Sequence, residues 1–330
     1  MTRLCVFGAG AIGGEIAARL ARAGQCEISV VARGPHLAAI KARGLRLIAG
    51  DDDFPVPVAA PARPAALGPQ DYVILAPKAH NMAQLVEPLQ PLLKPDTAIL
   101  FAQNGLPWWY FHGIDGALAG HRLESVDPGG VLWERLGPER ALGAVVWFAA
   151  VLEAPGVIRH SYGERLPVAE PSGERSGRVE TVSRLLTAAG FKSPVKPDLR
   201  PEIWLKLWGN LSFNPVSILT LGTLEELAAD PHSRAVIAAM MAEAQTVAEA
   251  LGIRFPVSID ERMAMAARVG AHRTSMLEDV LAGRPTELDA LLGAVIEMGK
   301  ITAMPTPVLK LVYDLARFRS RIAADPRPTP

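Results

Sequence analysis

Residues 4–14 read Leu-Cys-Val-Phe-Gly-Ala-Gly-Ala-Ile-Gly-Gly, and this stretch decides the fold of the first half of the chain. The apolar run 4–7 predicts a buried strand, and the apolar residues of 16–23 recur at helical spacing. Between them lies Gly-x-Gly-x-x-Gly, in the strand–turn–helix context that the pattern requires. A second strand is expected at 27–32. The combination predicts a dinucleotide-binding βαβ unit, and the alternative is a glycine-rich turn without a ligand.

Each glycine of the pattern has its own physical task. Gly8 permits the tight turn, Gly10 lets the backbone approach a pyrophosphate, and Gly13 lets the helix pack closely on the strand. The amino terminus of the helix adds N–H groups and a partial positive charge. The cofactor-binding residues predicted in this turn are Gly8, Ala9, Gly10, Ala11, Ile12 and Gly13.

The end of the second strand indicates which dinucleotide is bound. NAD-binding folds usually carry Asp or Glu there, which accepts a hydrogen bond from the ribose 2′-hydroxyl. This chain has Val-Val-Ala-Arg-Gly-Pro-His at 30–36, with no acid. The guanidinium of Arg33 can bind a 2′-phosphate bidentately and stack on adenine. The sequence therefore predicts NADP(H), and the alternative is that Arg33 is a solvated residue at the strand end.

Composition restricts the classes of protein to which the chain can belong. Its 330 residues suit two domains, and 49% hydrophobic with 21% charged residues is typical of a globular protein. The formal net charge is zero, so nothing attracts the chain to nucleic acid or to a membrane surface. Neither a signal peptide nor an apolar run long enough to span a bilayer is visible, so a cytoplasmic location is expected.

Metal and disulfide chemistry have no support in the sequence. The seven histidines are scattered without paired spacing, so no metal site is expected. The two cysteines, Cys5 and Cys26, form no disulfide framework and are expected to be reduced core residues.

Alternating strands and helices in the first half predict a doubly wound parallel sheet, and helical periodicity dominates from about residue 200. The fold class is therefore α/β, a Rossmann-type domain at 1–199 followed by an all-helical domain at 200–322, with a cleft between them and a disordered tail at 323–330. The strands expected are 4–7, 27–32, 71–76, 97–102 and 141–150. Helices are expected at 36–43, 82–93, 179–189, 201–219, 233–251, 257–269, 287–302 and 306–317, and an irregular segment at 51–64.

Ligands of such sheets bind beyond the carboxyl ends of the strands. Lys78, Asn104 and Ala149 lie at or near the ends of three predicted strands. All three are therefore predicted to bind the cofactor. For Lys78 the alternative is a solvated loop cation.

Residues 203–219 read Ile-Trp-Leu-Lys-Leu-Trp-Gly-Asn-Leu-Ser-Phe-Asn-Pro-Val-Ser-Ile-Leu. Lys206, Asn210 and Asn214 recur every four residues in an otherwise apolar segment, which places them on one face of a helix. Buried polar groups cost free energy unless they find partners. The spacing therefore predicts a stripe that faces a polar ligand. The alternative is a lysine lying along apolar surface, with two asparagines that cap a kink before Pro215.

Three polar residues farther along the chain are candidates to lie opposite Lys206 in the site. Ser275 and Asp279 are four residues apart and share a helical face. Glu287 lies in the first turn of the helix expected at 287–302. The alternatives are an ordinary helix-surface serine and a carboxylate that merely stabilises a helix amino terminus.

Together these pieces resemble the ketopantoate reductase (2-dehydropantoate 2-reductase) family over nearly the whole chain. The spacing Lys-x₃-Asn-x₃-Asn-Pro, followed far downstream by Ser-Met-Leu and Glu-Leu-Asp, is specific in combination. The matching segments are 8–14, 77–79, 103–105, 206–215, 275–277 and 286–289.

The resemblance implies NADPH-dependent reduction of a 2-oxo acid to a 2-hydroxy acid, with 2-dehydropantoate as the leading substrate and pantothenate biosynthesis as the setting. It implies that Lys206 is the general acid and that Glu287 contacts the cofactor ribose and orients Lys206. Asn104 would contact cofactor and substrate. The remaining substrate-binding residues implied are Asn210, Asn214 and Ser275, with Asp279 as a further polar contact.

Three departures from the family leave the substrate open. Trp-Trp-Tyr-Phe at 108–111 either lines the acyl pocket, acts as a lid or is core; 123–130 looks like an insertion; and Leu224 stands where some members carry a substrate-contacting asparagine. A paralogue acting on another 2-oxo or hydroxy acid is therefore an alternative. A further alternative is a regulatory protein that binds NADPH without turnover. The apolar helices of the second domain also allow a homodimer.

Overall fold

The computed structural model describes residues 1–324, apart from the side chain of His80. The chain divides into two compact units. Unit 1 comprises residues 1–103, 107–122 and 129–199, and unit 2 comprises 104–106, 123–128 and the chain from Arg200 onward. Two short segments from the first half of the sequence therefore belong to unit 2.

Unit 1 is built on a six-stranded sheet in the order β10-β7-β6-β5-β1-β2. Five neighbouring strands run parallel and β10 pairs antiparallel with β7, so the predicted parallel α/β sheet is confirmed. The four central strands are almost wholly buried, as their continuous apolar runs predict. The bounds are β1 (Arg3–Phe7), β2 (Glu27–Val31), β5 (Tyr72–Leu75), β6 (Ala98–Phe101), β7 (Ala141–Ala144) and β10 (Val168–Ala169).

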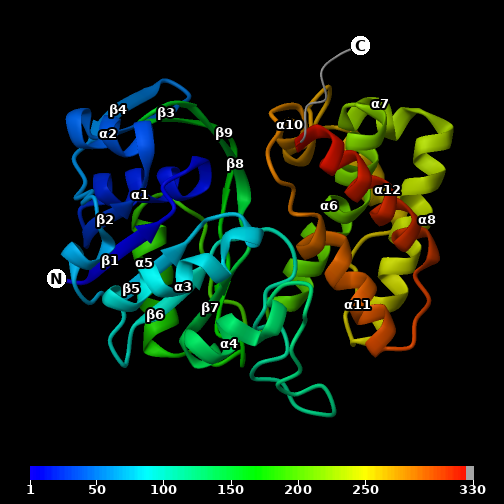
Figure 1. The fold of residues 1–330 in the computed structure, drawn as a ribbon, viewed down its shortest axis with the longest axis horizontal. Helices are drawn as coiled ribbons and strands as arrows, with labels where there is room; N and C mark the ends of the chain where they lie inside the picture. The colour runs from blue at the N-terminus through cyan, green and yellow to red at the C-terminus, as the bar shows by residue number, and fades with distance from the viewer. Residues whose placement is uncertain (325–330) are drawn as a thin grey trace. The chain divides into compact units, whose positions relative to one another are not determined.

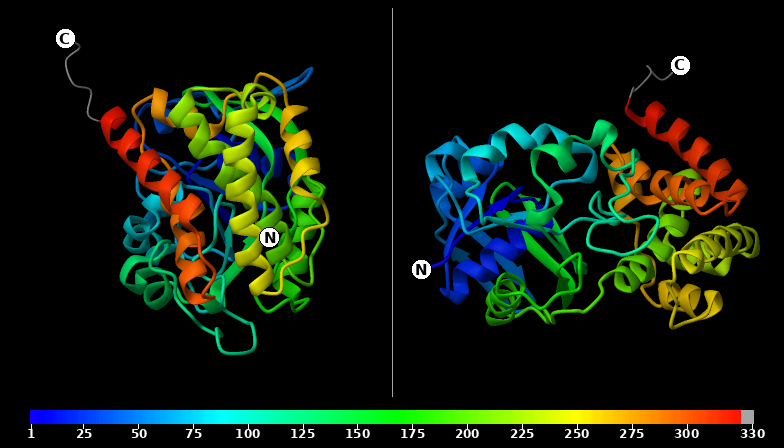
Figure 2. Two further views of the ribbon diagram at one scale, coloured as in Figure 1. Left: turned by 90° about the vertical axis from the view of Figure 1, so that its right-hand side faces the viewer. Right: turned by 90° about the horizontal axis from the view of Figure 1, so that it is seen from below.

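Helices cover both faces of this sheet. In the right-hand view of Figure 2 the short helices α3 and α4 lie over one face, and α1 and α5 lie over the other. The helices of unit 1 are α1 (Ala11–Ala23), α2 (Gly34–Arg43), α3 (Val86–Leu89), α4 (Val131–Arg135) and α5 (Gly177–Ala188). Short 3₁₀ turns lie at Pro64–Leu67, Ala79–Asn81, Ala83–Leu85, Gln90–Leu92, Pro128–Gly130 and Pro138–Arg140.

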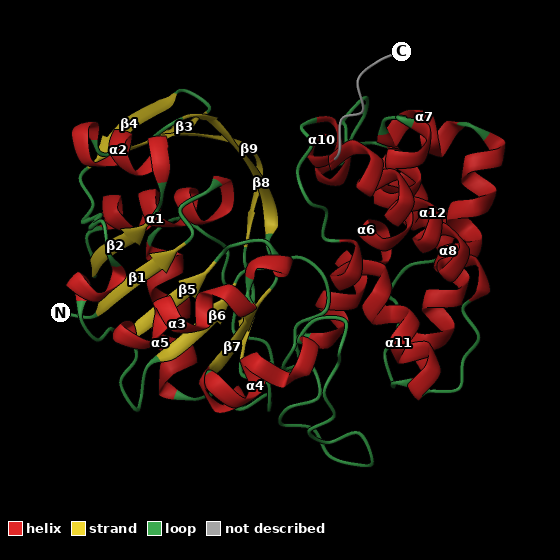
Figure 3. Cartoon of the chain, in the orientation of Figure 1, coloured by secondary structure: helices red, strands yellow, loops and turns green. Residues whose placement is uncertain are grey.

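A second sheet, which the sequence analysis missed, lies against the other side of α1. Its order is β4-β3-β9-β8, and all four strands contact α1. Figure 3 shows β8 and β9 as a long hairpin that curves beside the main sheet. The bounds are β3 (Leu45–Ala49), β4 (Asp52–Val56), β8 (Trp147–Ala154) and β9 (Val157–Arg165).

The second sheet corrects three expectations. The single strand expected at 141–150 is two strands, β7 and β8, in different sheets. Residues 51–64 are not irregular throughout, because they contain β4. The helix expected at 82–93 is broken into short turns around α3, because Pro88 and Pro91 have no N–H to donate to a helical hydrogen bond.

Unit 2 is helical, as predicted. Its longest helix, α6, contacts α8, α10 and α12, which surround it in Figure 1. The bounds are α6 (Arg200–Thr220), α7 (Leu224–Ala229), α8 (Pro231–Ala250), α9 (Ile259–Ala267), α10 (Ser275–Leu281), the π turn η7 (Asp289–Gly293), α11 (Ala294–Ile301) and α12 (Pro307–Ala324). Residues 323 and 324, expected in the disordered tail, continue α12; the rest of that expectation lies outside the described residues. No described helix has the length and hydropathy of a membrane span.

Candidate active site

The glycine turn after β1 has the geometry that its spacing predicts. Gly8 has φ +97°, in the region that favours glycine. A Cβ at Gly13 would lie 2.2 Å from the carbonyl oxygen of Gly8, so only glycine lets α1 start this close to the turn. These two glycines are therefore required by the fold itself.

Gly10 differs, because space is open beside it. A Cβ there would meet no heavy atom within 4 Å, and Gly10 is the exposed N-cap residue of α1. The helix has no side-chain cap and no acidic residue in its first turn. Its first N–H groups and positive dipole end are therefore available to an anion. The open space beside Gly10, together with the free N–H groups at the start of α1, fits the pyrophosphate of a dinucleotide.

Arg33 lies at the end of β2, the strand that pairs in parallel with β1. It is the exposed N-cap residue of α2. A guanidinium at this place fits a 2′-phosphate on the adenosine ribose.

Lys78 and Ala149 were both predicted to lie at strand ends of the parallel sheet, and the structure places only Lys78 there. Lys78 is half-buried and follows β5, the other neighbour of β1. Ala149 lies within β8 and pairs with Tyr162 of the second sheet. The prediction that Ala149 lies at a carboxyl end of the parallel sheet is wrong, because the chain leaves that sheet after Ala144.

Lys206 and Asn104, 102 residues apart, meet within unit 2. The ammonium Nζ of Lys206 donates to Asn104 Oδ1 at 2.7 Å. The helix α6 that carries Lys206 runs through Pro215 without ending, so the asparagines before Pro215 do not terminate a helix. Although it follows β6 in the sequence, Asn104 belongs to unit 2.

The backbone explains how Asn104 is held in unit 2. Gly105 has φ +87°, and a Cβ on it would lie 2.5 Å from the carbonyl oxygen of Ala290. The N–H of Leu106 donates to that same oxygen at 3.0 Å. Ala290 lies in the π turn η7, and such turns often occur at functional sites. A glycine thus lets the Asn104 segment pack directly on η7.

Glu287 lies beside this turn and acts on Lys206 through its charge. It precedes the helical residues, and its carbonyl accepts the N–H of Leu291. Burial lowers the pKa of Lys206 to about 8, and the negative charge of Glu287 opposes that change. Burial therefore outweighs the carboxylate, which the sequence left undecided.

Asn210 and Asn214 continue the face of α6 that begins with Lys206. Asn214 is 7% exposed and Asn210 is half-buried. Within residues 1–324, neither side-chain amide is hydrogen-bonded to another residue. Two amides on a mostly apolar helix face fit hydrogen bonding to a polar ligand.

The start of α10 is attached to the same part of α6. Ser217 Oγ donates to the backbone oxygen of Asn214 and lies 2.6 Å from Thr274 Oγ1. Thr274 is the N-cap of α10, so Ser275 is the exposed first residue of that helix. The buried Asp279 accepts a hydrogen bond from Arg284 Nε at 3.0 Å. Arg284 was not singled out by the sequence analysis, since an arginine five residues after an aspartate is a common surface pattern.

The aromatic segment and the apparent insertion have structural explanations. Residues 108–111 are each at most 3% exposed, and Trp108 packs edge-on against Phe101 and Trp133 in unit 1. They form core, the third of the roles left open. In unit 2, the carboxylate of Glu297 accepts the N–H groups of Glu124 and Ser125. Glu297 therefore fixes part of segment 123–128, and no local sequence pattern indicates this.

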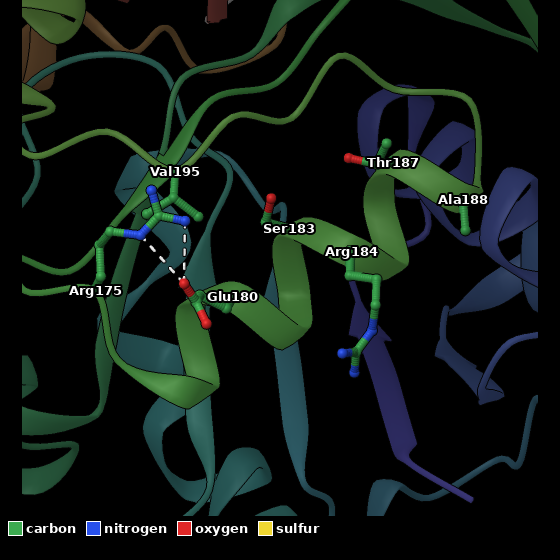
Figure 4. Close-up of a pocket in the computed structure, with 7 residues that line it drawn as sticks. All are labelled: Arg175, Glu180, Ser183, Arg184, Thr187, Ala188 and Val195. Carbon is green, nitrogen blue, oxygen red and sulfur yellow. Dashed lines mark hydrogen bonds and ion pairs between the residues drawn. The ribbon is translucent and has the colours of Figure 1, made fainter.

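One described cavity lies away from all of these residues. It has a volume of about 460 Å³ and runs along α5 (Figure 4). Arg175 at its edge is paired with Glu180, and Ser183 donates to the backbone oxygen of Ser193. Three of its polar residues thus have partners within the protein, and no predicted site residue lines it.

Comparison with known proteins identifies the family. Residues 4–173 match the model described as ketopantoate reductase PanE/ApbA, and residues 198–320 match its C-terminal counterpart. The chain belongs to the ketopantoate reductase family. It is 51% identical to a 2-dehydropantoate 2-reductase of Mesorhizobium japonicum, across 96% of this chain and 97% of that protein.

Solved structures agree with this assignment. A candidate ketopantoate reductase from Ralstonia solanacearum MolK2 superposes with a TM-score of 0.92 at 39% identity, covering 98% of this chain and 99% of the other. A PanE/ApbA family ketopantoate reductase from Ralstonia eutropha JMP134 gives 0.83 at 26% identity, covering 97% and 99%.

The comparisons confirm the resemblance, the fold class and the enzyme class predicted from the sequence. The chain is an NADP-dependent oxidoreductase of the type that acts on CH–OH groups, and its cofactor is NADP(H).

Proposed function

We propose that this enzyme reduces 2-dehydropantoate to pantoate with NADPH, as a step of pantothenate biosynthesis. The name of the 51% identical relative supports the substrate. The observation that carries the chemistry is the Lys206–Asn104 hydrogen bond beside the charge of Glu287. The alternative of another 2-oxo acid is not favoured by the comparisons.

The two units would divide the work. Unit 1 would hold NADPH through the turn 8–13, with Arg33 on the 2′-phosphate and Lys78 nearby. Unit 2 would hold the 2-oxo acid. When bound, the cofactor supplies the hydride that adds to the carbonyl carbon. The residues of this chain then have to bind the acid, stabilise charge on its oxygen and supply one proton.

Lys206 is suited to the last two tasks. Charge develops on the carbonyl oxygen as the carbon is reduced, and a positioned ammonium stabilises it and then donates a proton. With a pKa of about 8, Lys206 is mostly protonated at neutral pH yet gives up its proton far more readily than an ordinary lysine. Asn104 Oδ1 accepts a hydrogen bond from one of its N–H groups and so helps to orient the ammonium group.

The amides of Asn210 and Asn214 and the hydroxyl of Ser275 would bind the carboxylate and hydroxyl groups of the substrate. Their support is the shared face of α6 and the Ser217–Thr274 contact that places Ser275 beside it. Asp279 is proposed only as an indirect contact, because Arg284 already engages it. Glu287 would contact the cofactor ribose and keep Lys206 charged.

The experiment that tests this function is loss of NADPH absorbance with a panel of 2-oxo acids. 2-Dehydropantoate should give the highest kcat/KM, above 2-oxo acids that lack its hydroxyl group, since a site built to hydrogen-bond a hydroxyl rejects analogues without it. A higher kcat/KM for a larger or purely apolar 2-oxo acid would reassign the substrate. Binding of NADPH without turnover of any acid would leave a regulatory protein.

We also propose a homodimer and a cytoplasmic location. A dimeric ketopantoate reductase from Staphylococcus aureus shares the fold, with a TM-score of 0.73 at 19% identity. In this chain Leu311, Leu315 and Phe318 are each at least half exposed on α12 at helical spacing, a stripe that a second copy would cover. Light scattering of the wild type and of Leu315→Glu tests the assembly, since a dimer through α12 should dissociate. Fractionation of cells tests the location.

A further inference from the structure

His36 joins two backbone segments of unit 1 that are far apart in the sequence. It lies in the first turn of α2 and is half-buried. Its Nε2 is 2.5 Å from the carbonyl oxygen of Ala9 in the glycine turn. The N–H of Gly156, in the β8–β9 turn, donates to its Nδ1 at 2.9 Å. The imidazole therefore bridges the glycine turn and the second sheet.

These two contacts define the protonation state of the ring. Because Nδ1 accepts a hydrogen bond from a backbone N–H, it carries a lone pair and no proton. A neutral imidazole then has its proton on Nε2, which can donate to the Ala9 oxygen. The ring thus serves as an acceptor on one side and a donor on the other.

The Gly156 side of the bridge is rigidly held. The carbonyl of Gly156 accepts the N–H of Arg46 in β3 at 2.9 Å. Its φ is +81°, and a Cβ there would lie 3.1 Å from Ala39 Cβ of α2. His36 therefore connects the glycine turn to an anchored point and not to a free loop.

The contact with Ala9 affects the backbone N–H groups that are predicted to bind the cofactor. Ala9 C=O and Gly10 N–H belong to one planar trans peptide, in which they point in opposite directions. A donor fixed on the Ala9 oxygen therefore fixes where the Gly10 N–H points. It also polarises the peptide, which makes that N–H a stronger donor.

We propose that His36 is a positioning residue for NADP(H): its neutral imidazole holds the Ala9–Gly10 peptide in the orientation that binds the pyrophosphate. This inference rests on the NADP(H) assignment. It makes His36 act through the turn and not through contact with the reacting atoms. Its loss should therefore weaken the cofactor's binding and leave the chemical step unchanged.

Equilibrium titration of NADPH binding, followed by protein fluorescence, tests the proposal. His36→Ala should raise the Kd of NADPH about tenfold, the effect of losing about one net hydrogen bond. The KM for NADPH should rise in parallel, while kcat at saturating NADPH and the KM for the 2-oxo acid stay within about twofold. His36→Gln, whose amide has N–H donors and an oxygen acceptor, should recover most of the affinity. Where the alanine variant does not fold, His36→Gln compared with His36→Phe gives the same contrast.

His160→Gln is the matched comparison. His160 is also a half-buried histidine against α1, but it contacts the carboxylate of Glu15 within that helix and not the glycine turn. The Kd of NADPH for His160→Gln should stay close to that of the wild type. An unchanged Kd in His36→Ala, a Kd in His36→Gln as high as in His36→Ala, or an equal rise in His160→Gln would each overturn the role of His36. Failure of the wild type to bind NADPH would overturn the cofactor assignment instead.

Discussion

The glycine turn of unit 1 and the Lys206 face of unit 2 build binding groups in opposite ways. In the turn, the groups offered to the ligand are backbone N–H groups, and side chains are kept away: Gly8, Gly10 and Gly13 all lack one. On α6 the backbone is sealed within a helix, and the groups offered are three polar side chains among apolar neighbours. The glycine turn is suited to binding because side chains are absent from its three glycines. The α6 face is suited to binding because a few polar side chains lie among apolar ones, where burying them costs free energy.

This difference decides how each region should respond to mutation. In the turn an added methyl group acts by its volume, so the effect depends on what surrounds that glycine. On α6 the effect depends on the charge and hydrogen bonds of a single group, because the helix itself tolerates alanine well. The largest losses of rate are therefore expected from unit 2, and the sharpest contrast between stability and binding from unit 1.

Lys206→Ala should lower kcat by about 10²–10⁴, the usual contribution of a general acid, and leave the Kd of NADPH within about twofold. Single-turnover and steady-state NADPH oxidation measure the loss. Lys300→Ala removes an exposed lysine of the same unit and should keep wild-type kcat. Substantial turnover in Lys206→Ala would assign proton donation to another group.

The sequence indicated the turn and the α6 face because both are local. Three glycines at fixed spacing and polar residues every four positions depend only on helix and turn geometry. The assembly around Lys206 could not be predicted in the same way, since Asn104 reaches it through the packing of Gly105 on Ala290. The outcome for the pKa of Lys206 depends on how deeply it is buried, which is a tertiary property.

The second sheet of unit 1 was missed for a related reason. In β8 the last four residues are exposed, and in β9 most residues are, so neither has the apolar run that marks a buried strand. The sequence also shows no sign that β7 and β8 are separate strands, because the apolar residues continue between them through Val145 and Val146. Ala149 was assigned to the cofactor on that basis. Hydrophobic runs locate strands but do not reveal where a chain leaves one sheet for another.

Gly10→Ala and Gly13→Ala separate binding from folding within the turn. Gly13→Ala should lower the free energy of unfolding by about 1–3 kcal/mol, because its methyl would meet the Gly8 carbonyl oxygen. Gly10→Ala should leave the melting temperature unchanged and raise the Kd of NADPH about ten- to hundredfold. Thermal melts with and without NADPH measure both. Equal destabilisation by the two would mean that the space beside Gly10 is not reserved for a ligand.

Arg33→Ala should weaken NADPH about ten- to hundredfold through loss of charge-assisted hydrogen bonds to the 2′-phosphate. The Kd of NADH should change much less, because NADH has no such phosphate. Arg43→Ala, at the other end of α2 and also exposed, is the control for loss of one positive charge. Parallel loss of both cofactors would show that Arg33 acts on a shared part of the dinucleotide.

The smallest effect concerns the pH dependence of unit 2. Lys206 acts as an acid, so kcat/KM should fall as pH rises through its pKa of about 8. The carboxylate of Glu287 favours the protonated amine and therefore raises that pKa. Glu287→Gln removes the charge and keeps the size, so the falling limb should move to lower pH while the limb of Glu278→Gln, an exposed glutamate on α10, stays in place. A limb that does not move in Glu287→Gln would mean that a group other than Lys206 titrates, since Lys206 is the amine on which Glu287 acts.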